Sequence, residues 1–320
     1  MQTAVIIPAY RVEKHIERVI NSIPDFIDYI IVIDDASPDR TAEIVKKLQE
    51  SDQRIILIKH FNNQGVGGAM ISGFRKALET QADICIKMDG DGQMDSSYLK
   101  NLLEPLIQGI ADYTKGNRFR DFNALRKMPY LRRFGNLVLS FLIKAATGYW
   151  NIFDPTNGFI AIRREILSQL ELEQIDKTYY FETSMLANLY LINAKVIDVP
   201  VPARYGEEVS NLKISKIIFE FPPKLLRTLI RRIILKYFLF DFSMASVYLM
   251  TGLPLLCFGL VFGILKWIKY ASLAIPAPTG TVILPTMCIL LGIQFILSSL
   301  QIDLNSVPNQ PLSKPLPDIK

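Results

Sequence analysis

Two periodicities alternate along the first part of the chain. Short runs rich in β-branched residues are separated by segments in which apolar residues recur at the three- to four-residue spacing of an amphipathic helix. The runs predict strands at Thr3–Pro8, Tyr29–Asp34, Arg54–Lys59 and Asp83–Asp89. The segments between and after them predict helices at Glu13–Ser22, Thr41–Glu50, Gly67–Glu79 and Ser96–Gln108. This alternation indicates an α/β domain with a mainly parallel sheet.

Two long apolar stretches follow later in the chain. Met244–Leu265 and Gly280–Gln301 contain no Asp, Glu, Lys or Arg. As a helix, each stretch is on the order of 30 Å long, which is enough to cross the hydrocarbon core of a bilayer. The composition agrees, since 50% of the residues are hydrophobic and only 21% are charged. The sequence therefore predicts two transmembrane helices, at about 244–265 and 280–301, and excludes a simple cytosolic enzyme.

Basic charge is concentrated in two windows. Tyr113–Arg133 and Lys213–Lys236 each hold seven basic residues against one acidic residue, whereas the whole chain carries a net charge of only +5. Such windows attract anionic partners. Neither window interleaves aromatic residues as nucleic-acid-binding segments do, and the second precedes an apolar stretch. Lipid headgroups or lipid phosphates are therefore favoured over nucleic acid, with a solvated basic helix face as the alternative.

The segment between the α/β domain and the apolar stretches predicts interfacial helices. Lys213–Phe240 is expected to break at Pro222 and Pro223, and beyond the prolines leucine and isoleucine share one stripe. The arginines that favour other faces are Arg227, Arg231 and Arg232. An amphipathic helix of this kind lies in the membrane interface, and a helix packed on the α/β domain is the alternative. The predicted layout is an α/β domain over 1–210, juxtamembrane amphipathic helices over 211–240, two transmembrane helices within 241–302, and a disordered tail over 303–320.

The flanking charges also predict an orientation. More lysines and arginines precede the first apolar stretch than lie in the loop between the two stretches. The positive-inside rule then places the large domain and both termini in the cytoplasm. The first apolar run meets proline and charge within a few residues, so a buried strand is favoured there over a signal peptide.

Polar residues follow three of the predicted strands, where open α/β sheets bind their ligands. Tyr10 follows the first strand, Asp35 the second, and the fourth ends in MDGDGQ. Asp89 and Asp91 suit a hard divalent cation that also bridges a diphosphate, because the glycine between them lets both carboxylates approach one side. The alternatives are a solvated turn for the DxD sequence and, at the second strand end, capping of the following helix by Ser37 or Asp39.

Six short motifs occur in a fixed order: IIPAY, VIDDASPDRT, NNQGVGGAM, MDGDGQ, GNRF and FDPTNGF. On these motifs, residues 1 to about 205 resemble the catalytic domain of glycosyltransferase family 2, which has the nucleotide-binding, Rossmann-like GT-A fold. Within that family the likeness is to the dolichol-phosphate mannose synthase type, which moves a sugar from a nucleotide donor to a polyprenyl phosphate. The resemblance implies a GT-A domain followed by interfacial helices and two transmembrane helices.

The resemblance also implies roles for individual residues. Nucleotide binding falls to Pro8, Tyr10, Asp35 and Asp89. Mg²⁺ or Mn²⁺ would be held by Asp89, Asp91 and Gln93, and the acceptor phosphate would contact Arg118, Arg132, Arg133 and Arg204. The donor-sugar pocket would include Asp154, Asn157 and Glu182, and the catalytic set is Asp89, Asp91 and Arg118.

Several points stay open at this level. The choice between Arg132 and Arg133 is undetermined, and Glu182 is equally suited to be an acidic residue at a helix start. Relatives usually have Glu two places after the tyrosine, where this chain has Val12, so Glu13 is a candidate substitute for the missing acidic contact. The two histidines, His15 and His60, are assigned no role.

The implied reaction is a metal-dependent, inverting transfer from a GDP- or UDP-hexose to undecaprenyl or dolichyl phosphate, for envelope glycan or glycoconjugate synthesis. Such an acceptor needs no general base, because a phosphate monoester with a second pKa of about 6 is already ionised near neutral pH. It needs positive charge to aim it, which a basic window supplies. The expected partners are a nucleotide sugar, the polyprenyl lipid and the bilayer, with self-association through the transmembrane helices. The alternatives are another lipid-linked or polysaccharide acceptor, or a non-catalytic membrane scaffold.

Overall fold

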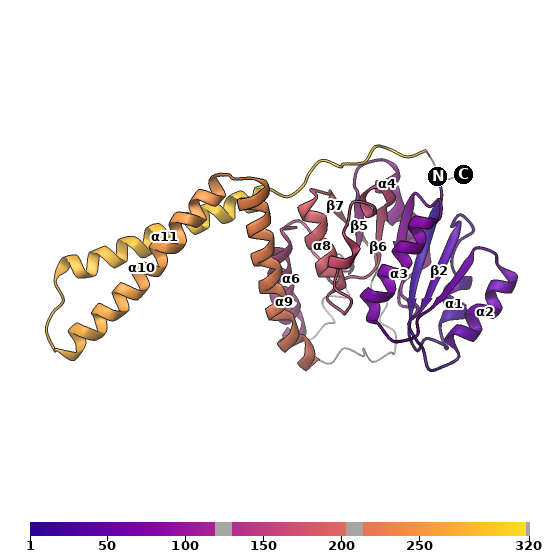
Figure 1. Cartoon of the computed structure of the whole chain (residues 1–320), viewed down its shortest axis with the longest axis horizontal. Coiled ribbons are helices and arrows are strands. Elements are labelled where there is room, and N and C mark those ends of the chain that lie inside the picture. The colour runs from indigo at the N-terminus through magenta and orange to yellow at the C-terminus, as the bar shows by residue number, and fades with distance from the viewer. Residues whose placement is uncertain (119–129, 203–213, 318–320) are drawn as a thin grey trace. The chain divides into compact units, whose positions relative to one another are not determined.

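The computed structural model describes residues 1–118, 130–202 and 214–317, and the chain forms two compact units. The first unit comprises Met1–Leu229 together with Pro308–Lys320, and the second comprises Ile230–Val307. Figure 1 shows the helices and strands of both units along the chain.

A seven-stranded sheet forms the centre of the first unit, with the strand order β3-β2-β1-β4-β6-β5-β7. The strands are β1 (Thr3–Ala9), β2 (Tyr29–Asp34), β3 (Ile55–Lys59), β4 (Ile84–Lys87), β5 (Tyr113–Asn117), β6 (Ile160–Arg163) and β7 (Val196–Pro200). Among the described strands, β6 alone runs antiparallel to its neighbours, so the sheet is mainly parallel. The predicted α/β class and the four predicted strands are confirmed.

Helices cover both faces of this sheet. On one face, α1 (Ile16–Asn21), α2 (Thr41–Ser51) and α4 (Leu99–Ile107) share one hydrophobic core with Val5 and Ile7. Ile6 points to the opposite face because strand side chains alternate, and there α3 (Gly65–Glu79) lies so close that a Cβ on Gly73 would collide with Ile6. Beside α3 lies α8 (Phe181–Leu191), joined to it by a contact between Phe74 and Phe181.

The remaining elements of the chain are shorter or lie further along it. They are η1 (Ser96–Tyr98), α6 (Tyr130–Thr147), α7 (Arg164–Leu167), η3 (Leu172–Gln174), α9 (Ile214–Ile234), η4 (Leu235–Phe240), α10 (Met244–Ser272) and α11 (Thr279–Asn305). The predicted helices at Glu13–Ser22, Thr41–Glu50, Gly67–Glu79 and Ser96–Gln108 correspond to α1, α2, α3 and to η1 with α4. At the start of α2, Asp39 accepts a hydrogen bond from Thr41 N over 3.2 Å, so Asp39 rather than Ser37 caps this helix.

Helix α9 differs from the sequence prediction, because it continues through Pro222 and Pro223 without a break. Each proline removes one helical N–H donor, yet the turns on both sides are held by packing. Phe221 and Leu225 lie in a small core with Ile143 of α6 and Tyr180. This stretch of α9 is thus packed on the first unit, as the alternative prediction proposed.

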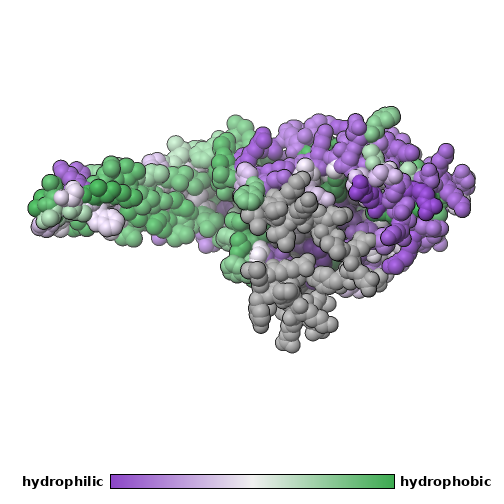
Figure 2. All heavy atoms as spheres, turned by 90° about the horizontal axis from the view of Figure 1, so that it is seen from below, coloured by the Kyte–Doolittle hydropathy of each residue, from purple (hydrophilic) through white to green (hydrophobic). Residues whose placement is uncertain are grey.

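The second unit is a helical hairpin in which α10 and α11 lie side by side (Figure 1). Both helices are long and apolar enough to cross a membrane, with a mean hydropathy of 2.1 in their most apolar windows, and they contain both predicted spans. Glycines allow the helices to approach closely, since a Cβ on Gly292 would lie 2.9 Å from the Gly252 carbonyl oxygen. Figure 2 shows that the surface of the hairpin is predominantly hydrophobic.

A buried polar cluster lies at one end of this unit. Arg232 Nη1 donates to Asp303 Oδ1 over 2.6 Å, and the Tyr237 hydroxyl donates to the same oxygen over 2.5 Å. Arg232 is only 3% exposed. Arg232, expected on a polar face of an interfacial helix, is instead buried, and its charge is paired with a carboxylate 71 residues away in the sequence.

The C-terminal segment differs from the predicted disordered tail. Asp303 belongs to α11, and residues 308–317 return to the first unit, where the buried Asp112 carboxylate accepts hydrogen bonds from Leu312 N and Ser313 N, each over 2.9 Å. Leu316 N donates to the Ile107 carbonyl over 2.8 Å. A proline-rich segment that forms no helix or strand needs hydrogen-bond acceptors from another part of the chain, and Asp112 is one of them.

Candidate active site

The carboxyl ends of β2, β1 and β4 lie at one edge of the sheet, because β1 pairs in parallel with both other strands. The loops after β1 and β2 are joined there, since Arg11 N donates to Ser37 Oγ over 3.2 Å. Arg11 and Ala36 have φ angles of 58° and 57°, a left-handed conformation that is unfavourable for residues other than glycine. The edge where ligands bind in open α/β sheets thus holds two strained loops.

Asp35 is the centre of a hydrogen-bond network at this edge. Its buried carboxylate accepts from Gln64 N over 2.9 Å and from Gly65 N over 2.8 Å, which fixes the loop before α3. The carboxylate also lies 2.7 Å from His60 Nδ1, and His60 Nε2 lies 2.9 Å from Ser72 Oγ. Because a carboxylate only accepts, Nδ1 is the donor in the contact with Asp35, and Ser72 Oγ is the hydrogen-bond partner of the other ring nitrogen. His60, to which the sequence assigned no role, therefore orients Asp35.

The other residues predicted for the nucleotide lie nearby. Pro8 is in β1, and Tyr10 follows the strand with 43% of its side chain exposed. Val12 packs near the DxD turn, since a Cβ on Gly90 would lie 3.3 Å from it. The Glu13 carboxylate accepts from Arg40 N over 3.1 Å. Their parts in nucleotide binding, and that of Glu13 as a substitute for an acidic residue at position 12, stay predictions.

Asp89 and Glu182 are brought together by a lysine that the sequence analysis did not single out. Lys87, the last residue of β4, is 1% exposed, and its Nζ donates to Asp89 Oδ1 over 2.7 Å. The same Nζ lies 3.3 Å from Glu182 Oε1 and 3.3 Å from the Gly158 carbonyl oxygen. Burial opposes the charged form of Lys87, but the carboxylates of Asp89 and Glu182 outweigh it and raise its pKa above the ordinary lysine value.

The remaining DxD residues form a tight turn. Asp91 Oδ1 accepts from Gln93 N over 2.9 Å, and Gly92 between them has a φ of 77°. The turn that was the alternative prediction is thus present, and the cation site at Asp89 and Asp91 stays a prediction. Among the described residues, no group of three or more His, Cys, Asp or Glu side chains is placed to hold a metal ion.

The donor set nevertheless fits a hard cation shared with a substrate. Mg²⁺ is usually held in proteins by one or two carboxylates together with substrate phosphates and water, rather than by a complete protein cage. Asp89 and Asp91 supply two such carboxylates, and Asp89 bonds to Lys87 through Oδ1, which leaves Oδ2 on the other side of the group. A site completed by a diphosphate agrees with both observations.

Arg118 and Asp154 form a two-point ion pair beside this region. Arg118 Nε donates to Asp154 Oδ2 over 2.8 Å and Nη2 donates to Oδ1 over 3.2 Å. Asp154 is fully buried, whereas 41% of the Arg118 side chain is exposed. The structure thus joins a predicted acceptor-phosphate residue to a predicted donor-sugar residue.

The DPTNG turn at residues 154–158 is held from below by the sheet. Lys115 of β5, also fully buried, donates to the Asn157 carbonyl oxygen. Burial lowers the pKa of Lys115 to about 8. The Asn157 side chain accepts from Phe159 N over 2.9 Å, while its buried Nδ2 has no partner among the described residues.

Gly158 occupies the most crowded point of the turn. A Cβ at this position would collide with Lys87 Nζ and lie 3.1 Å from Asp89 Oδ2 and 3.3 Å from Glu182 Oε1. Only glycine therefore fits between these side chains. Asp89, which is predicted to bind the metal and the nucleotide, thus lies close to Glu182 and to the turn that contains Asn157, the two residues predicted for the donor sugar.

Three of the predicted site residues cannot be placed at the side-chain level. Arg204 lies outside the described residues, and Arg132 and Arg133 belong to α6 but their side chains are not described. The residues that the sequence reasoning missed are His60, Lys87 and Lys115. Lys87 carried a signal, since a lysine within a short, otherwise apolar strand is buried and must be paired.

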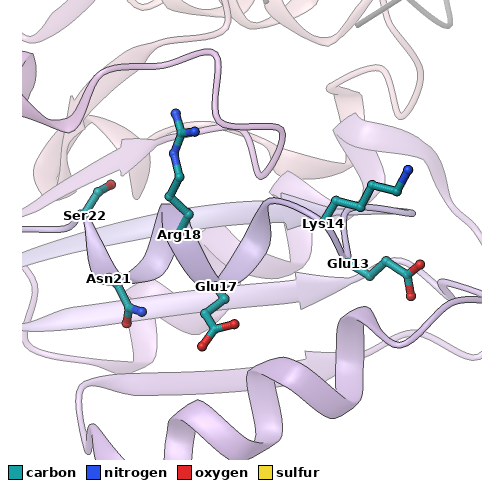
Figure 3. A pocket seen from close by; sticks show the side chains of 6 residues that line it. All are labelled: Glu13, Lys14, Glu17, Arg18, Asn21 and Ser22. Carbon is teal, nitrogen blue, oxygen red and sulfur yellow. The ribbon is translucent and has the colours of Figure 1, made fainter.

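The first unit also has a surface hollow at helix α1. It is lined by residues of α1 and its flanks, Glu13, Lys14, Glu17, Arg18, Asn21 and Ser22. Figure 3 shows that these side chains project in different directions rather than converge on a common point. The convergent chemistry is at the ends of β2 and β4, so the hollow is not assigned to the donor.

Comparisons with known proteins agree with the site. The model of the family described as glycosyl transferase family 2 matches residues 4–171. A UDP-N-acetylglucosamine–dolichyl-phosphate N-acetylglucosaminyltransferase of Methanococcus voltae is 33% identical over 215 residues, which cover 63% of this chain and 85% of the relative. A dolichol-phosphate mannosyltransferase of Pyrococcus furiosus is 31% identical over 232 residues, which cover 69% of this chain and 62% of the relative.

A solved structure shows the same fold. A mannosyltransferase from Pyrobaculum calidifontis, in complex with GDP-Man and Mn²⁺, has a TM-score of 0.50 at 16% identity, over 95% of this chain and 87% of that one. The family match spans more than half of the chain, and it begins in β1 and extends beyond β6. This protein therefore belongs to glycosyl transferase family 2 and is a glycosyltransferase.

Proposed function

We propose that this glycosyltransferase moves a hexose from a nucleotide sugar to the phosphate of a membrane polyprenyl phosphate, with a divalent cation and with inversion at the anomeric carbon. The observation that carries the proposal is the convergence of Asp89, Glu182 and the 154–158 turn around Lys87, in a chain that also holds two helices able to cross a membrane. The relatives named for dolichyl-phosphate transfer support the choice of acceptor.

The donor is proposed to bind across the ends of β2, β1 and β4. Asp35, oriented by His60, can accept a hydrogen bond from a nucleobase N–H or a ribose hydroxyl. The sugar would then lie against the 154–158 turn, where Asn157 Nδ2 is an unpaired donor among the described residues and Glu182 is an acceptor. The Methanococcus relative is named for UDP-N-acetylglucosamine and the Pyrobaculum structure contains GDP-Man, so the proposal covers both nucleotide classes.

The cation would be held by Asp89 and Asp91, with Gln93 adjacent, and by the donor diphosphate. When bound, it stabilises the negative charge that develops on the leaving nucleoside diphosphate. The Mn²⁺ that accompanies GDP-Man in the Pyrobaculum mannosyltransferase supports a divalent ion of this kind.

The acceptor phosphate would be aimed by the basic residues around Arg118. The guanidinium of Arg118 is anchored by buried Asp154, and 41% of the Arg118 side chain is exposed, so the group has a fixed position from which it could bind a phosphate. Arg132, Arg133 and Arg204 are further candidates for this contact. An ionised phosphate attacks without a general base, so positive charge and orientation are what these residues would contribute.

Two helix surfaces support catalysis at a bilayer. In addition to the apolar surface of the hairpin, large apolar side chains are exposed along one side of α6, at Phe134, Leu137, Val138, Phe141 and Leu142. Their spacing forms one stripe of the helix, and contiguous exposed apolar stripes mark membrane or protein contacts. We propose that this stripe dips into the interface, with the large domain and both termini on the cytoplasmic side, where nucleotide sugars are available to the donor site.

The experiment uses membranes that contain the full-length protein. They are incubated with Mn²⁺, undecaprenyl or dolichyl phosphate, and radiolabelled GDP-mannose or UDP-N-acetylglucosamine, then extracted with organic solvent. Label in an acid-labile lipid is expected, and it should be lost with EDTA and in Asp91→Ala. Asp25→Ala is the matched control, because Asp25 is a fully exposed aspartate far along the chain from the DxD turn. Label found only in a polymer, or undiminished in Asp91→Ala, would contradict the proposal.

A further inference from the structure

Two fully buried lysines lie in one row of the sheet beneath the 154–158 turn. Lys87 of β4 and Lys115 of β5 are both register partners of Ile160 in the intervening strand β6. Residues directly opposite one another on adjacent strands point to the same face, so the two ammonium groups approach the turn from the same side. They bind consecutive carbonyl oxygens of the turn, Lys115 that of Asn157 and Lys87 that of Gly158.

Only Lys87 also binds acidic side chains. Its three N–H donors have three oxygen neighbours, at 2.7 Å in Asp89, 3.3 Å in Glu182 and 3.3 Å in the Gly158 carbonyl. The set draws on three separate parts of the fold: the end of β4, the turn before β6 and the first turn of α8. One ammonium group thus holds Asp89, a proposed metal ligand, together with Glu182, a proposed sugar contact, and with the backbone of the 154–158 turn.

Such a cluster is not the most stable way to fill this volume. Burying ions costs several kcal/mol each, and well-packed apolar residues of similar size usually give equal or greater stability. The rest of β4, Ile84–Ile86, is apolar and buried, so a fourth apolar residue would fit the strand's pattern. The charged group is better explained by what it holds than by the stability that it adds.

We propose that Lys87 is a positioning residue that couples the diphosphate side of the donor site to its sugar side. The inference rests on the proposed function in one respect, that a nucleotide sugar is the donor. Without the ammonium group, the carboxylates of Asp89 and Glu182 face each other uncompensated and separate. The nucleoside would still bind, since the Asp35 and His60 network does not include Lys87. What is lost is the alignment of the sugar with the diphosphate.

The test separates sugar binding from nucleotide binding. Full-length wild type and Lys87→Met are titrated calorimetrically with GDP-mannose and GDP, and with UDP-N-acetylglucosamine and UDP, each with Mn²⁺. The expected result is that Lys87→Met binds the nucleotide sugar at least about tenfold more weakly, while the affinity for the nucleoside diphosphate changes less than about threefold. In the transfer assay, kcat should fall more than KM for the acceptor rises.

Two further variants keep the proposal falsifiable if Lys87→Met folds poorly. In Lys87→Met with Glu182→Gln, the uncompensated charge is removed, so the melting temperature should recover while sugar binding does not. Lys115→Met is the matched control, because it removes an equally buried ammonium group that holds the same turn but neither Asp89 nor Glu182. It should lower the melting temperature, with a much smaller selective loss of sugar affinity than in Lys87→Met.

The outcomes distinguish the two proposals. Equal losses of nucleotide-sugar and nucleoside-diphosphate affinity in Lys87→Met, or the same selective loss in Lys115→Met, would overturn the role of Lys87. A wild type that binds a nucleotide sugar but labels no polyprenyl phosphate would overturn the acceptor proposed above, and the Lys87 comparison would still be decided by the titrations.

Discussion

At the scale of single residues, the site is built from charged and polar groups that hold one another before any ligand arrives. Asp35 is tied to His60 and to two backbone N–H groups, and Asp154 is tied to Arg118. Preorganised groups of this kind lose little entropy when a ligand binds. Their partners therefore matter to function even where they touch no substrate.

His60 offers a direct check of that idea. His60→Ala removes the ring that orients the Asp35 carboxylate, and the affinity for the nucleoside diphosphate is expected to fall about tenfold, as for the loss of one hydrogen bond to a charged group. The measurement is calorimetric titration with GDP and UDP. His60→Asn retains an N–H donor at a similar position and should recover part of the affinity. Unchanged affinity in His60→Ala would show that Asp35 needs no orientation.

Lys115 predicts a pH dependence of stability. Burial lowers its pKa in the folded protein to about 8 from the ordinary value of 10.5, so between these values the unfolded chain binds more protons than the folded one. Stability from this group therefore rises as pH increases through that window. Lys115→Met lacks this gain, so its melting temperature in detergent should fall relative to that of wild type between about pH 7 and about pH 10. A difference in melting temperature between Lys115→Met and wild type that is constant with pH, or that changes in the opposite direction, would contradict the lowered pKa of Lys115.

At the scale of elements, the sequence pattern predicted those helices and strands whose formation depends on local sequence. Strands β1 to β4 and helices α1 to α4 follow from apolar periodicity, and α10 and α11 follow from uninterrupted apolar length. The same reasoning failed at Pro222 and Pro223, because the packing of α9 on α6 and Tyr180 overrides a local preference. It also missed the pairing of Arg232 with Asp303, since nothing near either residue in the sequence announces a partner on another helix.

For the candidate site too, the residues marked by local motifs were predicted and those defined by long-range contacts were not. The strand-end motifs located Asp35, Asp89 and the 154–158 turn because each follows a recognisable strand or turn sequence. Lys87 and His60 were missed because their roles depend on contacts between segments, such as that of Lys87 in β4 with Glu182 in α8. Contacts of that range depend on topology, which sequence periodicity specifies only in part.

The exposed stripe of α6 carries the prediction at this scale. Phe134→Ser with Phe141→Ser makes the stripe polar, which weakens its insertion into the interface by roughly 25 cal/mol for each Å² of apolar surface no longer buried. Transfer to polyprenyl phosphate in nanodiscs is expected to fall severalfold, while calorimetric affinity for the nucleoside diphosphate stays constant. Ile110→Ser alters an exposed apolar residue outside α6 and is the control. Full transfer by the double variant would exclude a membrane role for the stripe.

At the scale of the whole molecule, the order of the chain differs from a simple domain followed by an anchor. The first unit contains residues from both sides of the helical hairpin, Met1–Leu229 and Pro308–Lys320. The chain therefore leaves the first unit before the hairpin and rejoins it after the hairpin. Asp112 binds the segment that rejoins the first unit. That aspartate is fully buried and accepts from the backbone N–H groups of Lys195, Leu312 and Ser313.

This arrangement predicts that the C-terminal segment stabilises the α/β unit rather than trailing from it. Asp112→Ala leaves buried N–H groups without an acceptor, and deletion of residues 308–320 removes the segment itself. Each change should destabilise the protein by about 2 kcal/mol or more, as expected for hydrogen bonds to a buried charge. Because both remove the same contacts, the combined variant should lose far less than the sum of the two, measured as melting temperature in detergent. Asp25→Ala, at an exposed aspartate, should leave the melting temperature unchanged. Additive losses would mean that Asp112 and the C-terminal segment act independently, and a deletion without effect would mean that the returning chain adds no stability.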